Sequence, residues 1–317
     1  MIAPEDFKNA LTSLPQLVSE KNQAPRVFKL SVKKRFDGFT LLELYAQSFP
    51  HVDREFWLNK IESGNVLVDQ KVGTSQQILR AGQITQHSVA AKPEPKVNWD
   101  IQLIAATENY WVISKPSPLP VHAGGRYLFN TLTAGLKLAF PEQSFHLINR
   151  LDANTTGIVL VALNKATANF LSKQFENREV EKTYLAVVEG HPSETSFSSQ
   201  KGISKEKTPA GGRQLVEESV SKTDFQLLKT FKADSLLEVT PHSGHTNQIR
   251  LHLAGLGLPI KGDLGYKDPV YFKSNPLTYP EDSLFLHAWK LRFQDQKTNQ
   301  EVLVESRPND RWAPYLN

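Results

Sequence analysis

The chain has 317 residues, of which 39% are hydrophobic and 22% are charged, a composition typical of a globular protein with room for two domains. It contains no cysteine, which excludes disulfides, thiolate metal sites and cysteine nucleophiles. No apolar run approaches the roughly 20 residues of a membrane helix, and the N-terminus has no apolar signal core, so we expect a cytoplasmic protein without a membrane partner. The formal net charge of +4 favours polyanionic partners.

The N-terminal segment and one proline-rich stretch mark the expected domain limits. Residues 1–30 hold short apolar patches separated by Pro4, Pro15 and Pro25, and we expect an extension that packs loosely. Lys-Pro-Glu-Pro-Lys at positions 92–96 is a stiff, charged spacer, since its prolines cannot join the interior of a sheet. We therefore predict an extension over residues 1–30, a small domain over 31–92, a linker over 93–97 and a large domain over 98–317.

Two helices are predicted in the small domain. Leu41, Leu44 and Tyr45 stand at i, i+3 and i+4, which is the spacing of one helix face. A second helix follows Asp53, a favourable N-cap, and ends at Gly64, a favourable C-cap. A small ribbon comes next, with a strand at 66–68 and turns at 69–71 and 82–83.

The large domain alternates strands and helices without a regular βαβ repeat, which indicates the α+β class rather than a doubly wound sheet. Strand-like runs occupy residues 101–105, 111–114, 158–163, 184–188, 236–240 and 284–293. Helices are predicted over 165–177 and from an N-cap at Thr246 to 255–259, and residues 295–300 read as a hairpin turn. Residues 196–212 are polar and carry lysines and a Gly-Gly pair, so we expect a mobile surface loop there.

One carboxylate is distinguished by its surroundings. Asp152 lies in a turn-like segment flanked by the apolar pairs 147–148 and 158–159, so the edge of a core controls its environment. The alternative is an aspartate that only forms the turn or caps a helix. Arg250, on the predicted helix after Thr246, is a candidate counter-ion; the alternative is a surface arginine on an amphipathic helix.

Several segments, in order along the chain, resemble the RluA family of pseudouridine synthases. Asn149–Gly157 matches the family's His-Arg-Leu-Asp-x-x-Thr-Ser-Gly motif, and Lys182–Ala186 matches its Lys-x-Tyr-x-Ala strand. Gly244–Arg250 and Pro259–Asp263 match Gly-Arg-Thr-His-Gln-Ile-Arg and Pro-Ile-x-Gly-Asp. Shorter matches complete the series at Lys115-Pro116, Pro120-Val121-His122 and Leu286-His287-Ala288. Residues 30–90 resemble, more loosely, the small S4 RNA-binding domain.

The resemblance implies an α+β fold with a mixed, largely antiparallel central sheet flanked by helices, and it implies a role for each matching residue. Asp152 takes the place of the catalytic aspartate, Arg250 of its partner, and Tyr184 of the aromatic that stacks on the base. Arg150 takes the place of an arginine that fills the space left by a flipped base. The implied substrate-binding residues are Arg150, Lys182, Thr155 and Leu286. Without the resemblance, Tyr184 reads as a strand aromatic of the core.

Three positions depart from the family pattern. Asn149 stands for His, His245 for Arg and Asn247 for His. These changes leave the three catalytic candidates in place, but they alter hydrogen bonding and charge beside them.

The sequence therefore predicts a monomeric isomerase that converts specific uridines of ribosomal or transfer RNA to pseudouridine by base flipping. The isomerisation demands no cofactor and no metal, and DNA is not an expected partner. In the S4-like domain the candidate RNA-binding residues are Lys33, Lys34, Arg35, Arg54 and Lys60; the alternative is a solvated helix face beside a basic run.

Two other kinds of protein stay open at this stage. A non-catalytic RNA-binding or assembly protein on a degenerate synthase fold would carry the same segments. A carboxylate hydrolase usually needs a second carboxylate, for which Asp263 is the nearest candidate by motif.

Overall fold

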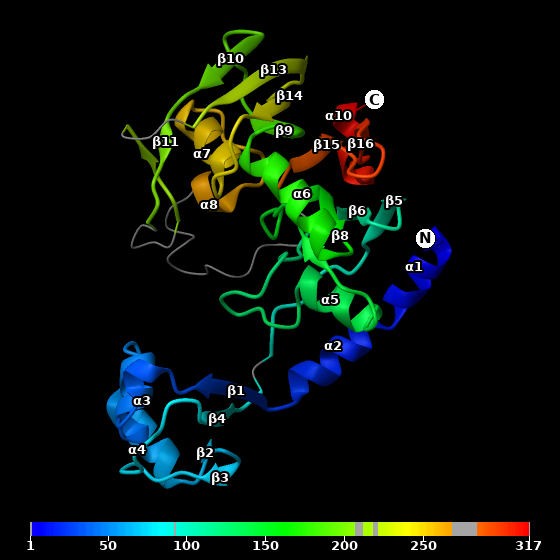
Figure 1. Ribbon diagram of the computed structural model, residues 1–317. Coiled ribbons are helices and arrows are strands. Elements are labelled where there is room, and N and C mark those ends of the chain that lie inside the picture. Colours follow the sequence, from blue (N-terminus) through cyan, green and yellow to red (C-terminus); the bar gives the residue numbers. More distant parts are fainter. Residues whose placement is uncertain (1, 92, 207–211, 218–220, 268–283, 317) are drawn as a thin grey trace. The chain divides into compact units, whose positions relative to one another are not determined.

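The computed structural model describes residues 2–91, 93–206, 212–217, 221–267 and 284–316. The chain forms two compact units: Ser19–Pro93 is the smaller, and the residues before and after it form the larger (Figure 1). Each unit has its own buried hydrophobic clusters. None of the helices in these ranges has the length and apolarity that crossing a lipid bilayer requires.

The smaller unit combines two helices with a four-stranded antiparallel sheet of order β1-β4-β2-β3. Its elements are β1 Arg26–Ser31, η1 Lys34–Phe36, α3 Leu41–Ser48, α4 Arg54–Glu62, β2 Val66–Val68, β3 Lys71–Val72 and β4 Ile84–Val89. A capping box between Thr40 and Glu43 starts α3, and the Asp53 carboxylate caps α4. Both predicted helices are confirmed, because their caps and their buried apolar faces agree.

The first 30 residues do not pack loosely, so that prediction is wrong. They form two helices, α1 Pro4–Thr12 and α2 Leu14–Gln23, and they lead into β1. Helix α1 belongs to the larger unit, and β1 is the first strand of the smaller unit. Phe7 is 1% exposed, and its ring lies 5.5 Å from the rings of both Trp111 and Phe140. Pro4 and Pro15 stand in the first turns of their helices, where the missing N–H costs no hydrogen bond, so they start helices rather than break them.

The larger unit is built on a ten-stranded mixed sheet of order β10-β13-β14-β9-β15-β8-β6-β5, with β16 beside β15 and β7 beside β8. Its strands are β5 Gln102–Ala106, β6 Tyr110–Lys115, β7 His146–Leu147, β8 Thr156–Ala162, β9 Glu181–Glu189, β10 Ser196–Ser199, β13 Thr223–Thr230, β14 Asp234–Pro241, β15 Leu286–Gln294 and β16 Glu301–Glu305. Only the β8–β15 pair is parallel among the described pairs. The predicted α+β class and largely antiparallel sheet are confirmed.

Further helices complete the larger unit (Figure 1). They are α5 Leu132–Ala139, α6 Lys165–Glu176, α7 Gln248–Gly255, α8 Leu264–Lys267, η2 Asp310–Trp312 and α10 Ala313–Leu316. Helix α6 confirms the prediction over 165–177, and the β15–β16 hairpin confirms the turn at 295–300.

The predicted loop over 196–212 is wrong where the structure describes it. The segment contributes β10 to the main sheet and β11 Gly202–Ile203, which pairs with β12 Leu215–Val216 as a separate hairpin. Gly202 and Ile203 are buried, so a polar composition here conceals short paired strands. Residues 207–211 of the predicted loop lie outside the described residues.

Candidate active site

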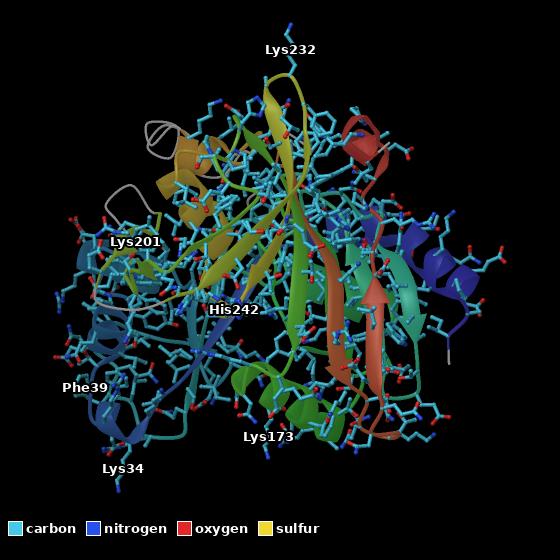
Figure 2. The ribbon with its side chains drawn as sticks, turned by 90° about the horizontal axis from the view of Figure 1, so that it is seen from above. Lys34, Phe39, Lys173, Lys201, Lys232 and His242 are labelled. Atoms are coloured by element: carbon cyan, nitrogen blue, oxygen red, sulfur yellow. The ribbon has the colours of Figure 1, made fainter. Side chains whose placement is uncertain are left out.

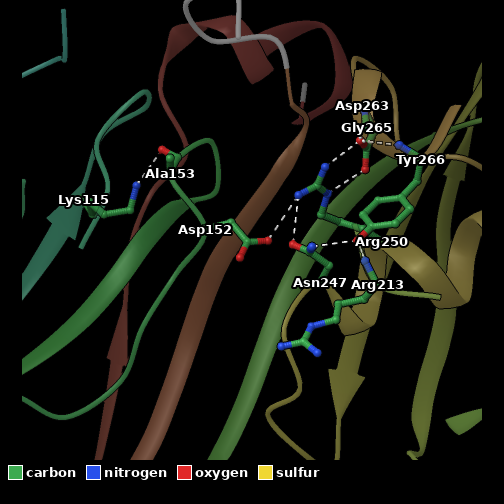
Figure 3. A network of polar contacts seen from close by, with 9 residues as sticks. All are labelled: Lys115, Asp152, Ala153, Arg213, Asn247, Arg250, Asp263, Gly265 and Tyr266. Atoms are coloured by element: carbon green, nitrogen blue, oxygen red, sulfur yellow. Dashed lines mark hydrogen bonds and ion pairs between the residues drawn. The ribbon is translucent and has the colours of Figure 1, made fainter. Parts of the chain in front are cut away.

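Asp152 lies in the connection between β7 and β8, on a turn that is held from several sides (Figure 3). The Thr155 N–H donates to the Asp152 carbonyl at 3.1 Å, and the Leu119 N–H donates to the Ala153 carbonyl at 2.9 Å. The Lys115 ammonium also donates to the Ala153 carbonyl, at 3.1 Å. The Asp152 side chain is 32% exposed, so a fixed backbone presents a carboxylate that a ligand can reach.

Lys115 is a positioning residue that the sequence prediction did not assign. Its side chain is 0% exposed, and its ammonium donates to the carbonyls of Pro116 and Ala153. A buried ammonium must be satisfied by hydrogen bonds or opposite charge, so this cation is tied to the turn next to Asp152. The available signal was the match of Lys115-Pro116 to the family pattern.

The backbone at position 157 requires the glycine that ends the Asn149–Gly157 motif. It pairs with Ala288 in the parallel register of β8 and β15, and its φ is +108°. A Cβ atom at this position would lie 2.2 Å from the Ala288 carbonyl oxygen and 2.7 Å from the Ala288 nitrogen. Glycine alone permits both this φ and this approach, so it lets the Asp152 turn lead directly into the central sheet.

Arg250 comes from α7, whose start differs from the prediction. The N-cap is Asn247 and not Thr246, because Asn247 adopts the left-handed conformation with φ +59° and the helix follows it. Asparagine tolerates this conformation better than most side chains do. The Arg250 side chain is 5% exposed, which excludes the alternative of a surface arginine.

The guanidinium of Arg250 bridges two carboxylates (Figure 3). Its Nε and Nη2 donate to the two oxygens of Asp263, each at 2.7 Å, and its Nη1 donates to Asp152 at 3.4 Å. The Asp263 side chain is 1% exposed and also accepts from the N–H groups of Gly265 and Tyr266. Asp263 therefore holds the arginine, and Asp152 is the weaker but more exposed partner.

Asn247 and Tyr266 extend this cluster. Asn247 accepts a hydrogen bond from Arg250 Nη1 at 3.0 Å and donates to the Tyr266 hydroxyl at 2.7 Å. The Arg250 guanidinium carbon lies 4.9 Å from the centre of the Tyr266 ring. Burial is the main cause that raises the pKa of Tyr266, so the hydroxyl stays neutral.

Tyr184 lies on β9 opposite Ala288 of β15 and Val239 of β14. It is half-buried and packs against two of the hydrophobic clusters of the larger unit. Its pKa is raised above the usual range, first by burial and second by the negative charge of Asp152. The phenol is therefore neutral and close enough to Asp152 to feel its charge.

The four predicted substrate-binding residues differ in accessibility. Arg150 is exposed. Lys182 is half-buried and donates to the Ser243 carbonyl at 3.0 Å, and burial lowers its pKa. Thr155 is 2% exposed and Leu286 is 4% exposed, so little of either surface is open to a ligand.

Asn149, where the family has histidine, supports the fold. Its Nδ2 donates to the Ile158 carbonyl at 3.0 Å, and its Oδ1 accepts from the Leu160 N–H at 2.8 Å. The amide thus completes the hydrogen bonding of β8 beside the Asp152 turn. His245 is exposed and leaves the pairing of Arg250 unchanged.

His287 ties the parallel strand pair to the chain beyond β16. Its Nε2 lies 2.9 Å from the Ser306 carbonyl, so Nε2 carries the proton, and Nδ1 accepts from the Thr156 hydroxyl at 2.7 Å. The side chain is 1% exposed, and burial lowers its pKa to about 4 against the opposing effect of the Ser306 carbonyl. His287 is therefore neutral at physiological pH.

The basic residues predicted in the smaller unit lie at η1, just after β1, and on α4. Lys33, Lys34, Arg35 and Arg54 are exposed, and Lys60 is partly exposed. The Arg35 guanidinium lies 4.6 Å from the Phe36 ring centre. Among the residues that the structure describes, no group of three or more histidine, aspartate or glutamate side chains is arranged to hold a metal ion.

Comparisons with known proteins identify the family of the chain. Residues 109–255 match the family model described as RNA pseudouridylate synthase. An RNA pseudouridine synthase of Synechocystis, whose name marks it as uncharacterized, is 30% identical over 266 residues, which cover 83% of this chain and 91% of that protein. The chain belongs to the RluA family of RNA pseudouridine synthases.

Two further relatives extend the match. The ribosomal large subunit pseudouridine synthase D of Nitrosomonas europaea is 26% identical over 332 residues, which cover 100% of this chain and 94% of that protein. The solved structure of human RNA pseudouridylate synthase domain containing 1 is similar with a TM-score of 0.54 and 26% identity, covering 68% of this chain and 86% of that one. As a family member the chain is an isomerase that acts on RNA, and nothing favours the binding-only alternative.

Proposed function

We propose that Asp152 is the catalytic carboxylate with which this enzyme converts uridines of structured ribosomal or transfer RNA to pseudouridine. The observation that carries the proposal is a difference in exposure within one charged cluster. Arg250 and Asp263 are 5% and 1% exposed, whereas the Asp152 side chain is 32% exposed. Asp152 is thus the member of the cluster that a ribose can approach.

The chemistry requires no more than a positioned carboxylate. Isomerisation breaks the N1–C1′ bond, rotates the uracil and joins C5 to C1′. The C5 proton leaves and N1 gains a proton, so atoms and electrons balance without an oxidant or a leaving group. A carboxylate serves such a sequence as nucleophile or as base.

Arg250 keeps the carboxylate ready for this role. Its Nη1 donates to the Asp152 carboxylate at 3.4 Å, so a positive charge lies beside the reacting group. Because Asp263 and Asn247 hold the guanidinium from two other sides, the charge is in place before RNA binds. A preorganised charge costs no reorganisation during the reaction.

Access to a stacked nucleotide requires the target to leave its helix. Enzymes that act on a base flip it into a pocket and stack it on an aromatic side chain. Tyr184 supports this proposal as a half-buried aromatic on β9 whose pKa is raised first by burial and second by the charge of Asp152. Arg150 supports it as an exposed cation two residues before Asp152. Lys182 adds positive charge next to Tyr184 on the same strand.

The test is release of tritium. The pure enzyme is incubated with unmodified ribosomal and transfer RNA transcripts that carry uridine tritiated at C5, with chelator present. Formation of the C5–C1′ bond releases this tritium to water, and mapping of the product identifies the modified uridine. Absence of release from both RNA classes, together with unmodified uridine in the recovered RNA, contradicts the proposal.

We also propose that the smaller unit is an S4-like domain that binds RNA through its exposed cations. Replacing Lys34 and Arg35 together with alanine should weaken RNA binding and lower the salt dependence by about two counterions, because neutralised phosphates release bound cations. An unchanged salt slope contradicts this role. We further propose that the enzyme is a monomer, is cytoplasmic and prefers RNA to DNA. Sedimentation tests the first property, cell fractionation the second, and competition with DNA the third.

A further inference from the structure

The β11–β12 hairpin brings one arginine to the edge of the catalytic cluster. Arg213 immediately precedes Gln214 and β12, and its backbone N–H donates to the Tyr266 hydroxyl at 3.2 Å. That hydroxyl also accepts from Asn247, which accepts from Arg250, which donates to Asp152. Arg213 is therefore joined to the catalytic carboxylate through three side chains (Figure 3).

The hairpin is fixed to α7, the helix that carries Arg250. The His252 ring lies 2.9 Å through Nε2 from the Lys201 carbonyl, just before β11. Leu215 of β12 packs directly on Gly255, where an added Cβ would lie 2.5 Å from the Leu215 Cδ1 atom. These contacts place the backbone of Arg213 by rigid elements rather than by a free loop.

The guanidinium of Arg213 has donors to spare. Its Nη1 donates to the Ser204 carbonyl at 3.2 Å, and within the part of the chain that the structure describes it forms no ion pair with a carboxylate. The side chain is only partly buried. Arginine carries five N–H donors in a planar fork, so most of this fork faces no described acceptor.

Charge and geometry suit this fork to one kind of ligand. Arg250 is already held by Asp263, whereas the positive charge of Arg213 has no such partner among the described residues. RNA brings a phosphate to each side of any nucleotide placed at Asp152. A guanidinium fork binds phosphate oxygens in a bidentate manner and with a strong preference over neutral groups.

We propose that Arg213 binds a backbone phosphate of the RNA next to the target uridine, and that the Tyr266 hydroxyl holds Arg213 in position for this contact. The inference rests on the proposed function, because it takes the nucleotide to lie at Asp152. It adds a contact from outside the short motifs on which the resemblance was based, on a hairpin that the sequence did not predict.

The experiment measures binding of a fluorescent, uridine-containing RNA stem–loop by anisotropy between about 50 and 200 mM salt. Arg213→Ala should lower the affinity about tenfold and reduce the slope of log K against log salt by about one. Arg213→Lys should keep the slope and recover part of the affinity. Lys232→Ala removes one charge at the turn between β13 and β14 (Figure 2) and should change neither quantity by more than about twofold.

Tyr266→Phe tests the positioning. It keeps the ring beside Arg250 but removes the hydroxyl, so the affinity should fall several-fold with an unchanged salt slope. Tyr315→Phe is the matched control, since it also removes a hydroxyl that bonds two partners, Lys261 and Asp234. Wild-type affinity in Tyr266→Phe would remove Tyr266 from the account.

Turnover is measured in parallel, which separates this inference from the proposed function. An Arg213→Ala protein whose affinity and slope equal those of Lys232→Ala overturns the inference, whether or not the enzyme releases tritium. A wild type that binds RNA without releasing tritium overturns the isomerisation at Asp152, while the salt slopes still decide the phosphate contact.

Discussion

Replacing Asp263 by asparagine removes the nearest counter-ion of a buried arginine. The Asp263 carboxylate accepts four hydrogen bonds, two of them from Arg250 at 2.7 Å and two from the N–H groups of Gly265 and Tyr266. Asparagine keeps the shape but offers one acceptor oxygen and turns an NH2 group toward a donor. Asp152, at 3.4 Å, is then the carboxylate that still pairs with Arg250 among the described residues.

Loss of one partner of a buried ion pair costs about 3–5 kcal/mol. Both side chains are at most 5% exposed, so we expect the Asp263→Asn change to lie in this range. Urea unfolding should show a lower midpoint with an unchanged m-value. Glu305→Gln is the control, because the Lys290–Glu305 pair at 3.4 Å has an exposed glutamate and a partly exposed lysine and should contribute less than about 1 kcal/mol. A loss below about 1 kcal/mol for Asp263→Asn would refute the view that Asp263 holds Arg250.

Three further predictions concern the frame around the site. Gly157→Ala should cost at least about 3 kcal/mol in urea unfolding, because its Cβ would lie 2.2 Å from the Ala288 carbonyl at a φ of +108°; a stable variant would mean that β8 and β15 are not so closely paired. Lowering the pH from 6.5 to 4 should reduce the free energy of unfolding by up to about 3 kcal/mol through His287, because the unfolded chain binds this proton near pH 6.5 and the folded chain only near its pKa of about 4. In the His287→Gln variant the free energy of unfolding should fall less over this window, and a pH profile equal to that of the wild type would contradict the prediction. Phe7→Ala should lower the free energy of unfolding by about 3–5 kcal/mol, because the ring is 1% exposed and packs against Trp111. An unchanged thermal midpoint would mean that α1 contributes nothing to the stability of the larger unit.

The sequence predicted the elements whose signals are local. Helices α4 and α6 carry their own N-caps, Asp53 and Asn164, and an apolar face. The segment around Asp152 was recognisable because turn residues and an apolar strand follow each other directly. Helices α1 and α2 were missed because a local signal was misread. Their prolines were taken as interruptions, although a proline in the first turn is compatible with a helix.

The arrangement of the site depends on contacts between distant segments. Asp263 reaches Arg250 across 13 positions, and Asp152 reaches it across 98, and no periodicity in the sequence reports such a distance. The burial of Arg250 was likewise hidden, because its guanidinium is held by Asp263 from a separate segment. Its helix also packs, through His252 and Gly255, on the β11–β12 hairpin of a segment that was predicted as a loop. The left-handed Asn247 places the helix start one residue after the predicted N-cap, and its side chain accepts a hydrogen bond from Arg250.

The most direct test of the account compares the wild type with Asp152→Asn in the tritium-release assay. Asp152 is 32% exposed, and Arg250 keeps Asp263 when Asp152 is neutral, so the thermal midpoint and the RNA affinity should stay near those of the wild type. The account predicts release by the wild type and release at background by Asp152→Asn. Equal release by both proteins would contradict the assignment of Asp152 as the catalytic carboxylate.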